Sequence, residues 1–254
     1  MTGEFKKNYI DQVILRIDFP STPLEIENKL PMELLKIILP QFPIPEEKEL
    51  FEKGYKIDFR DDKVDVEKSN KITEWYYYNK NRKRSICISK KYVFFIYKEW
   101  DDRTYTELEG VFNNIVSTLF NISNIQVTRL GLRYINHIEL TETDSDPTKW
   151  NGYLNDGIIS IFNIVEAGFQ TSRAFQNLEL ILPEMRLRFQ YGMHNPDYPA
   201  AIKRKLFVLD YDGYCEYLQD QKDIKDNMSK INAQISNLFK RSIGPKLEAL
   251  MKGE

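Results

Sequence analysis

The sequence predicts an α+β protein made of two similar halves, each an antiparallel sheet covered by a long helix. Apolar and polar residues alternate with a period of two over much of the chain, which is typical of strands with one buried face. Two such regions are each followed by apolar residues spaced three and four apart, the stripe of an amphipathic helix. We therefore expect one half over residues 1–124 and the other over 125–254, packed as one compact unit. If the two sheets join side by side into one continuous sheet, the helices would cover one face and leave a concave face open.

The first half reads as a strand, a helix, a meander and a second helix. A strand over Tyr9–Phe19 precedes a helix that begins at Thr22-Pro23, and the prolines of Pro40–Pro45 mark the exit loop of that helix. Alternation then predicts antiparallel strands joined by charged loops, at Gly54–Arg60, Val64–Val66, Ile72–Asn79, Ser85–Ser89 and Tyr92–Trp100. The apolar stripe over Tyr105–Phe120 predicts a long helix that docks on this meander.

The second half repeats this plan in looser form. It opens with a long strand over Ile125–Leu140, and the polar segment Thr141–Trp150 is expected to be a loop. A short helix within Leu154–Phe162 is followed by three predicted strands, at Asn177–Leu182, Met185–Tyr191 and Lys205–Tyr211. A long amphipathic helix over Ile224–Phe239 and a short one that ends at Leu250 complete the chain.

Composition and charge narrow the classes of protein. The chain of 254 residues is 42% hydrophobic and 29% charged, which is a globular balance, and its 15 Tyr and 15 Phe favour strands. A net charge of −2 gives no overall field for a polyanion, so nucleic-acid binding would need a local basic patch. Two cysteines far apart in the chain, and apolar runs shorter than the ~18–20 residues of a membrane span, predict a soluble cytoplasmic protein without membrane contact.

The central strand divides its side chains between a core face and a polar face. Its apolar side chains share one face, and the other face collects Arg129, Gly131, Arg133 and His137. Arg129, Arg133 and His137 are therefore candidates for binding a ligand or a phosphate, and Gly131 would leave room for a ligand or an aromatic ring. The alternative is that both arginines pair with carboxylates on neighbouring strands, such as Glu179 or Glu184, a common structural use of arginine.

Arg186 and Arg188 repeat this pattern in the second half of the chain. Together with Arg129 and Arg133 they would form a basic strip across one sheet face. A basic strip beside exposed tyrosine and tryptophan is how a sheet holds single-stranded nucleic acid.

Other chemistry-bearing residues are few. Asp210 and Asp212 lie two residues apart, so they share one strand face and could hold Mg²⁺, but the same segment also reads as a strand that ends in an Asp-Gly turn. His137 and His194 are the only histidines, and neither has metal-site spacing. The sequence contains no G-x-S-x-G, Walker A or G-x-G-x-x-G motif. We therefore expect no cofactor, and the sequence favours a binding protein over an enzyme.

Four segments carry a resemblance to other proteins. They are R-L-G-L-R-Y-I-N, Arg129 to Asn136, which is the most specific, and NYIDQVILRIDFP, LFVLDYD and INAQISNLFKRSIGPKLEALM. Together they resemble a sporadically distributed family of uncharacterised prokaryotic proteins. The resemblance implies no catalytic residues. The patchy occurrence of this family looks like that of genes carried on mobile or defence islands.

Two hypotheses of function follow. The favoured one is a non-enzymatic interaction protein, such as a sensor, immunity or regulatory subunit of a prokaryotic two-gene module in antiviral defence, that binds a protein partner through its sheet face and aromatic edges. The alternative is a nucleic-acid-binding protein or metal-dependent nuclease, with the arginine strip on phosphate and the two aspartates on Mg²⁺. The sequence is also compatible with a homo-oligomer.

Overall fold

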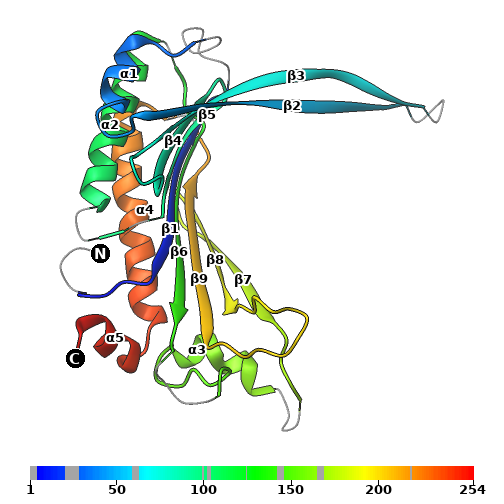
Figure 1. Ribbon diagram of the computed structural model, residues 1–254, viewed down its shortest axis with the longest axis vertical. Helices are drawn as coiled ribbons and strands as arrows, with labels where there is room; N and C mark the ends of the chain where they lie inside the picture. The colour runs from blue at the N-terminus through cyan, green and yellow to red at the C-terminus, as the bar shows by residue number, and fades with distance from the viewer. Residues whose placement is uncertain are drawn as a thin grey trace.

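The computed structural model of the chain describes residues 5–20, 29–58, 63–98, 100–101, 104–123, 125–141, 146–164, 169–217 and 219–254, excluding the side chains of 52–70 and 163. In these residues one antiparallel sheet of nine strands runs through both halves of the chain, in the order β2-β3-β4-β5-β1-β6-β9-β8-β7. The long helices α2 and α4 lie along one face of it (Figure 1). The predicted α+β class is confirmed, and the two sheets join into one.

The strands are β1 (Ile10–Asp18), β2 (Ile44–Asp58), β3 (Lys63–Tyr78), β4 (Arg84–Ser89), β5 (Tyr92–Tyr97), β6 (Arg129–Glu139), β7 (Ala174–Ile181), β8 (Arg186–Met193) and β9 (Leu206–Cys215). The helices are α1 (Met32–Ile38), α2 (Thr104–Ile122), α3 (Asp156–Ile159), α4 (Gln221–Ser242) and α5 (Pro245–Lys252), with a 3₁₀ helix over Ser160–Ile164. None of the described helices is long and apolar enough to cross a membrane.

The two halves follow the same order of elements and meet at one strand pair. Each half begins with a central strand, β1 or β6, and ends with a long helix, α2 or α4. In each half the last strand of a meander, β5 or β9, returns to pair with that central strand. β1 and β6 then pair antiparallel with each other, so that Leu15 lies opposite Leu132. This pairing makes a single sheet of the two halves.

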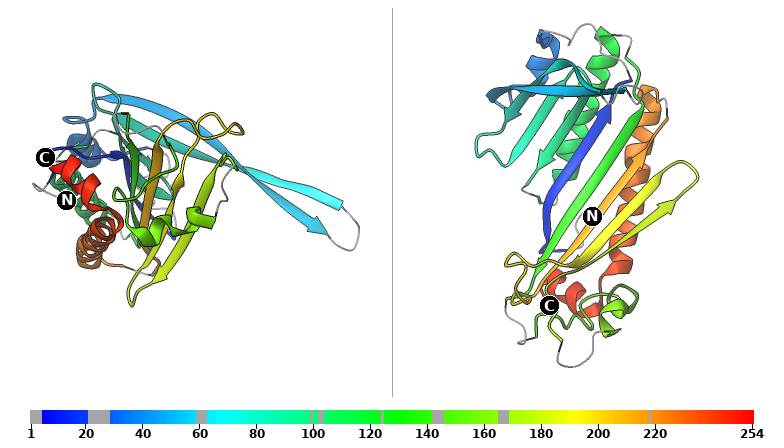
Figure 2. Two further views of the ribbon diagram at one scale, coloured as in Figure 1. Left: turned by 90° about the horizontal axis from the view of Figure 1, so that it is seen from below. Right: turned by 90° about the vertical axis from the view of Figure 1, so that its right-hand side faces the viewer.

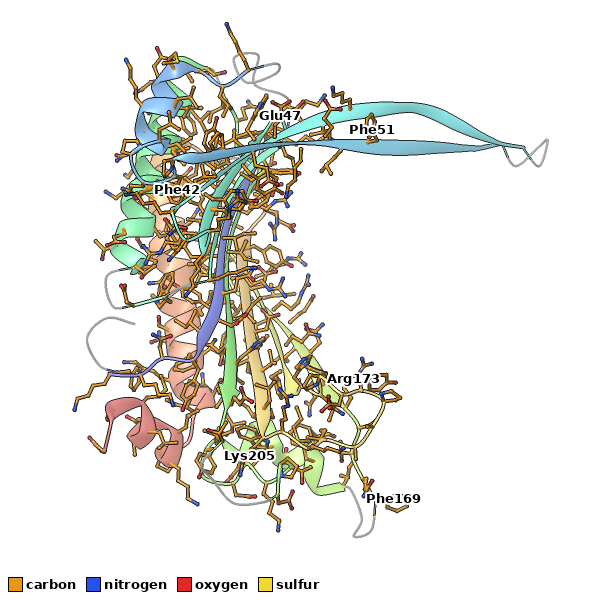
Figure 3. The ribbon with its side chains drawn as sticks, viewed as in Figure 1. Phe42, Glu47, Phe51, Phe169, Arg173 and Lys205 are labelled. Carbon is orange, nitrogen blue, oxygen red and sulfur yellow. The ribbon has the colours of Figure 1, made fainter. Side chains whose placement is uncertain are left out.

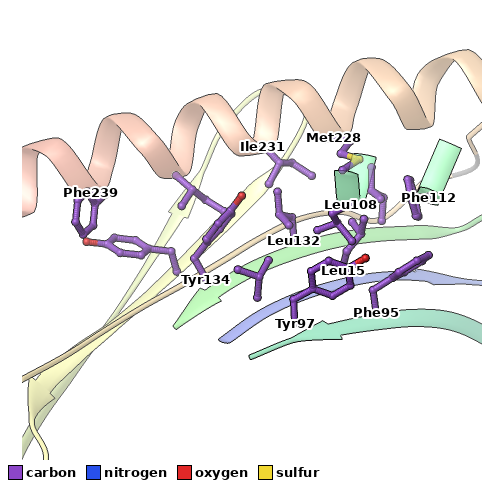
Figure 4. Close-up of a cluster of buried hydrophobic side chains, with 14 of the residues drawn as sticks. Leu15, Phe95, Tyr97, Leu108, Phe112, Leu132, Tyr134, Met228, Ile231 and Phe239 are labelled. Carbon is purple, nitrogen blue, oxygen red and sulfur yellow. The ribbon is translucent and has the colours of Figure 1, made fainter. Parts of the chain in front are cut away.

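The core lies between the sheet and the helices α2 and α4 (Figure 4). Strand residues Leu15, Phe95 and Leu132 are fully buried there against helix residues such as Phe112 and Ile231. The rings of Phe95 and Phe112 meet edge to face with their centroids 5.8 Å apart. Each such side chain contributes about 1.5–3 kcal/mol through its removal from water. Packing of this kind fixes which face of every strand is covered.

Strands β2 and β3 are longer than the sequence indicated. Only Glu74–Tyr78 of β3 pairs with β4, and the rest of the two strands forms a two-stranded arm that projects from the open side of the sheet (Figure 1). Phe51 lies on the arm and is 61% exposed (Figure 3). The exit loop predicted over Pro40–Pro45 is too long, because β2 begins at Ile44. An edge strand tolerates Pro45, since the outward side of its backbone needs no N–H.

The helix start predicted at Thr22-Pro23 lies outside the described residues, and α1 begins only after Pro31. The Asp-Gly turn predicted at residues 210–213 is wrong, because β9 continues to Cys215. Gly213 lies against helix α4 and is not part of a turn. A Cβ there would lie 2.6 Å from Ile231 Cγ2 of α4.

We predict that Gly213→Ala destabilises the protein by about 1–3 kcal/mol, because the added methyl overpacks the contact between β9 and α4. The matched control is Gly110→Ala in α2, where an added Cβ meets nothing within 4 Å. This control should stabilise the protein by about 0.5–1 kcal/mol through helix propensity. Urea unfolding followed by circular dichroism measures both changes. Equal stability of the two variants would contradict the packing argument.

Candidate functional site: the open face of the sheet

The candidate residues from the sequence share the face of the sheet that has no helices. Leu130, Leu132, Tyr134 and Ile138 of β6 are buried on the helix side, as predicted. Side chains alternate along a strand, so the arginines between them lie on the opposite face. The right-hand view of Figure 2 looks onto this face, with α4 behind it. We call this side of the whole sheet, which has no helices, the open face. Its candidate residues from the sequence, on β6, β9 and β8, are Arg129, Arg133, His137, Asp210, Asp212, Arg186 and Arg188.

The register of the strands sets opposite charges against one another. Arg133 lies opposite Asp212, Asp212 opposite Arg188, and Arg188 opposite Glu179. This row of alternating charge crosses β6, β9, β8 and β7. The structure therefore brings two of the four candidate arginines onto one line, with a carboxylate between them.

Arg133 is held by a bidentate pair with Asp210. Its Nε donates to Asp210 Oδ1 at 2.8 Å, and its Nη2 donates to Oδ2 at 2.6 Å. These hydrogen bonds raise the pKa of Arg133 above its ordinary value. The side chain of Asp210 is only 10% exposed, and both of its oxygens already accept from the guanidinium. Asp210 is thus the structural partner of Arg133.

Asp212 lies among three arginines but touches none of them. In the part of the chain that the structure describes, no group forms a hydrogen bond or ion pair with its carboxylate. Burial raises the pKa of Asp212 and outweighs the opposing influence of Arg129, Arg133 and Arg188. Among the described residues no group of three or more His, Cys, Asp or Glu could hold a metal ion. Both oxygens of Asp210 accept hydrogen bonds from Arg133, so Asp212 is the only member of the predicted Mg²⁺ pair whose oxygens have no partner among the described residues.

Arg129 forms ion pairs at the end of the open face where β6 begins. Its Nη1 lies 3.6 Å from Asp18 Oδ2, and its Nε lies 3.9 Å from Glu216 Oε1. The guanidinium also lies over the ring of Tyr214, 5.1 Å from the centroid. A Cβ at Gly131 would meet Arg129 Nη1 at 3.2 Å. The room that Gly131 provides is therefore filled by Arg129 and not by a ligand.

The two arginines of β8 differ from each other. Arg188 Nε lies 3.4 Å from Glu179 Oε1, a partner that the sequence suggested for an arginine of β6. Glu184 instead pairs with Lys230 of α4. Arg186 is exposed and has no ion pair among the described residues. Three of the four candidate arginines thus have a carboxylate partner within the protein.

The two histidines lie together at the end of the open face where β6 ends. The rings of His137 and His194 are nearly parallel, with their centroids 6.2 Å apart. His137 Nδ1 lies 3.8 Å from Asp11 Oδ1, and the ring of Phe175 packs against His194. Their meeting depends on the strand order, so nothing in the local sequence indicated it. No serine or cysteine lies in these contacts, so they show no nucleophile–base pair.

Aromatic side chains form a cluster that the sequence only partly indicated. Tyr76 and Tyr78, the alternate members of Trp75–Tyr78, are stacked on the open face with their centroids 6.0 Å apart. Phe94 of β5 packs edge to face on Tyr76. The hydroxyls of Tyr76 and Tyr92 both donate to the buried carboxylate of Glu74.

Cations flank this aromatic cluster. Arg16 lies over Tyr92 at 4.3 Å, and Lys48 lies over Tyr76 at the same distance. Arg16 also donates to Asp18 Oδ1 from both Nε and Nη2. Cys87 is buried beside the cluster, and burial raises the pKa of its thiol, which keeps it protonated and a poor nucleophile.

No family model matches the chain, and no curated protein matches its sequence.

We predict that Arg133→Ala destabilises the protein by about 1–3 kcal/mol, because it leaves the carboxylate of Asp210 buried without a partner. The lower part of this range applies if water reaches Asp210 through the space of Arg133, which is 39% exposed. Arg186→Ala on the same face should change stability by less than about 0.5 kcal/mol. Urea unfolding distinguishes the two variants, and an equal effect of both would contradict the structural role of Arg133.

We predict that Asp212→Asn is more stable than the wild type at pH 7. Burial raises the pKa of Asp212 in the folded state, so the ionised carboxylate costs stability above that pKa. The cost disappears as the pH falls below the unfolded pKa, so the two melting temperatures should converge near roughly pH 3. Asp210→Asn is the control and should destabilise at pH 7, since Arg133 loses its partner. A constant difference between Asp212→Asn and wild type across this pH range would contradict the prediction.

Proposed function

We propose that this chain is a non-enzymatic interaction protein whose open face binds a protein partner. The observation that supports this most directly is the charge balance of that face. Arginines and carboxylates lie opposite one another across β6, β9, β8 and β7, and clustered tyrosines continue the same face across β3 and β5. Tyrosine and arginine are the residue types that dominate the binding energy of protein interfaces.

The same charge balance argues against nucleic acid as the ligand. A polyanion would gain little field from arginines that Asp18, Asp210 and Glu179 already neutralise. Phosphate oxygens would have to displace these carboxylates one by one. A protein partner with its own charged rim can instead match the alternating row without breaking it.

The resemblance of Arg129–Asn136 to a sporadic prokaryotic family suggests the source of the partner. A chain of that family would be the sensor, immunity or regulatory subunit of a two-gene module in antiviral defence, and its partner would be the product of the neighbouring gene. Binding through a preformed sheet would need no rearrangement of the backbone.

Affinity capture from the native host with matched charge reversals tests this proposal. Arg186→Glu/Arg188→Glu changes the open face, and Lys222→Glu/Lys225→Glu makes the same change of charge at exposed positions of α4. Mass spectrometry identifies the companion of the wild type, and calorimetry then measures its affinity for each variant. The open-face variant is expected to bind at least about tenfold more weakly, and the α4 variant like the wild type.

Three outcomes would overturn the proposal. One is the absence of any stoichiometric protein companion, and another is equal binding by both variants. The third is a raised 260/280 nm absorbance ratio that falls after nuclease or high-salt treatment, which would identify nucleic acid as the ligand. Circular dichroism of both variants confirms that any loss of binding is not a loss of fold.

A further inference from the structure

Strand β7 presents a free edge of the sheet. β7 pairs with β8 on one side, and no other described strand pairs with its outer side. In the right-hand view of Figure 2 the β7–β8 hairpin forms the right-hand border of the sheet. The unpaired N–H and C=O groups of such an edge are a template for another strand. This surface is distinct from the open face, because it consists of backbone at the border of the sheet.

The two edges of the sheet differ in composition. The other edge strand, β2, begins Ile-Pro-Glu-Glu-Lys-Glu, and proline and charge are the residues that discourage pairing at an edge. β7 reads Ala-Phe-Gln-Asn-Leu-Glu-Leu-Ile, without proline and with Glu179 as its single charge. Phe175, Leu178 and Ile181 of β7 are 38%, 45% and 81% exposed. An edge of this kind is expected to be covered.

The free stretch of β7 has a definite length. Just before β7, the backbone carbonyls of Thr171 and Ser172 already accept hydrogen bonds from the loop after β8. Ile202 N donates to Thr171 O at 2.9 Å, and Asn195 Nδ2 donates to Ser172 O at 2.9 Å. Arg173, labelled in Figure 3, lies over the ring of Tyr198 at 4.8 Å. The stretch open to pairing is therefore 175–181, and its central residue is Leu178.

This stretch is complementary to itself in one antiparallel register. A twofold axis at Leu178, perpendicular to the sheet, places Phe175 opposite Ile181 of the second copy and Leu178 opposite its own counterpart. Asn177 then lies opposite Glu179, so no like charges face each other. An axis at Asn177 would place Phe175 opposite Glu179, and an axis at Glu179 would place two carboxylates opposite each other. Both lose the apolar matching.

We propose that β7 is a self-association edge, at which two copies of this chain pair antiparallel around Leu178 to form one continuous sheet. A twofold axis perpendicular to the sheet keeps both open faces on the same side. The dimer would therefore present one extended open face with a β2–β3 arm at each end. This inference concerns a different surface and a different ligand from the proposed function, and each can fail without the other.

Sedimentation velocity from about 1 to 100 µM tests the dimer, since a strand-edge contact belongs to the small and weak class of interfaces. The wild type is expected to dimerise in this range. Leu178→Asp, which sets two carboxylates opposite each other, should weaken dimerisation at least tenfold. Leu50→Asp on β2 is the matched control, because Leu50 is 42% exposed on the other edge, and it should dimerise like the wild type. A monomeric wild type at 100 µM, a dimeric Leu178→Asp or an equally weakened Leu50→Asp would each overturn the proposal.

Cysteine cross-linking tests the register and does not depend on a disruptive variant. In Leu178→Cys the two Cβ atoms would lie about 4.5–5.5 Å apart across the axis, near the range in which a disulfide forms. The natural thiols, Cys87 and Cys215, are buried and do not compete. Mild oxidation should give a covalent dimer of Leu178→Cys and none of Ile181→Cys, whose counterpart lies far along the strand. Cross-linking of Ile181→Cys, or none of Leu178→Cys, would overturn the register.

Discussion

The antiparallel pairing of β1 with β6 is the contact on which the rest of the structure depends. Each half of the chain closes its own meander onto its own central strand, and these two strands then pair with each other. The register of this pair sets Leu15 opposite Leu132 on the covered side and Ile14 opposite Arg133 on the open side. A slip of one residue would exchange the two faces, moving apolar side chains into water and arginines under α4. The burial of the core therefore fixes the composition of the open face.

The open face is polar yet largely satisfied within the molecule. Arg129, Arg133 and Arg188 reach carboxylates on neighbouring strands, and Glu74 accepts from two tyrosine hydroxyls. Such a face has no strong field of either sign. In the proposed function this face would discriminate between partners, because only a surface with matching alternation can approach without leaving a charge unpaired. This is the physical basis for proposing a protein and not a polyanion as the ligand.

The two edge strands of the sheet, β2 and β7, differ in how strongly their sequences discourage pairing with another strand. β2 combines proline and charge and extends with β3 into an arm, whereas β7 leaves a largely apolar stretch with one charge, Glu179, at the border. A sheet in which proline and charge discourage pairing at one edge, and not at the other, can add strands at the second edge only. Pairing at that edge would close the second border and end the growth at two copies.

The sequence by itself determined the class of the fold, the alternation of nearly every strand and the two long helical stripes, because hydrophobic periodicity follows directly from local geometry. It also placed Arg129, Arg133 and His137 on one face of one strand. It misjudged Asp210–Gly213 because an Asp-Gly pair has the same letters in a turn and under a helix, and only the position of Ile231 distinguishes them. The partner of each arginine, the meeting of His137 with His194 and the free edge at β7 were decided by strand order and register alone. These are relations between residues far apart in the chain, which local periodicity does not encode.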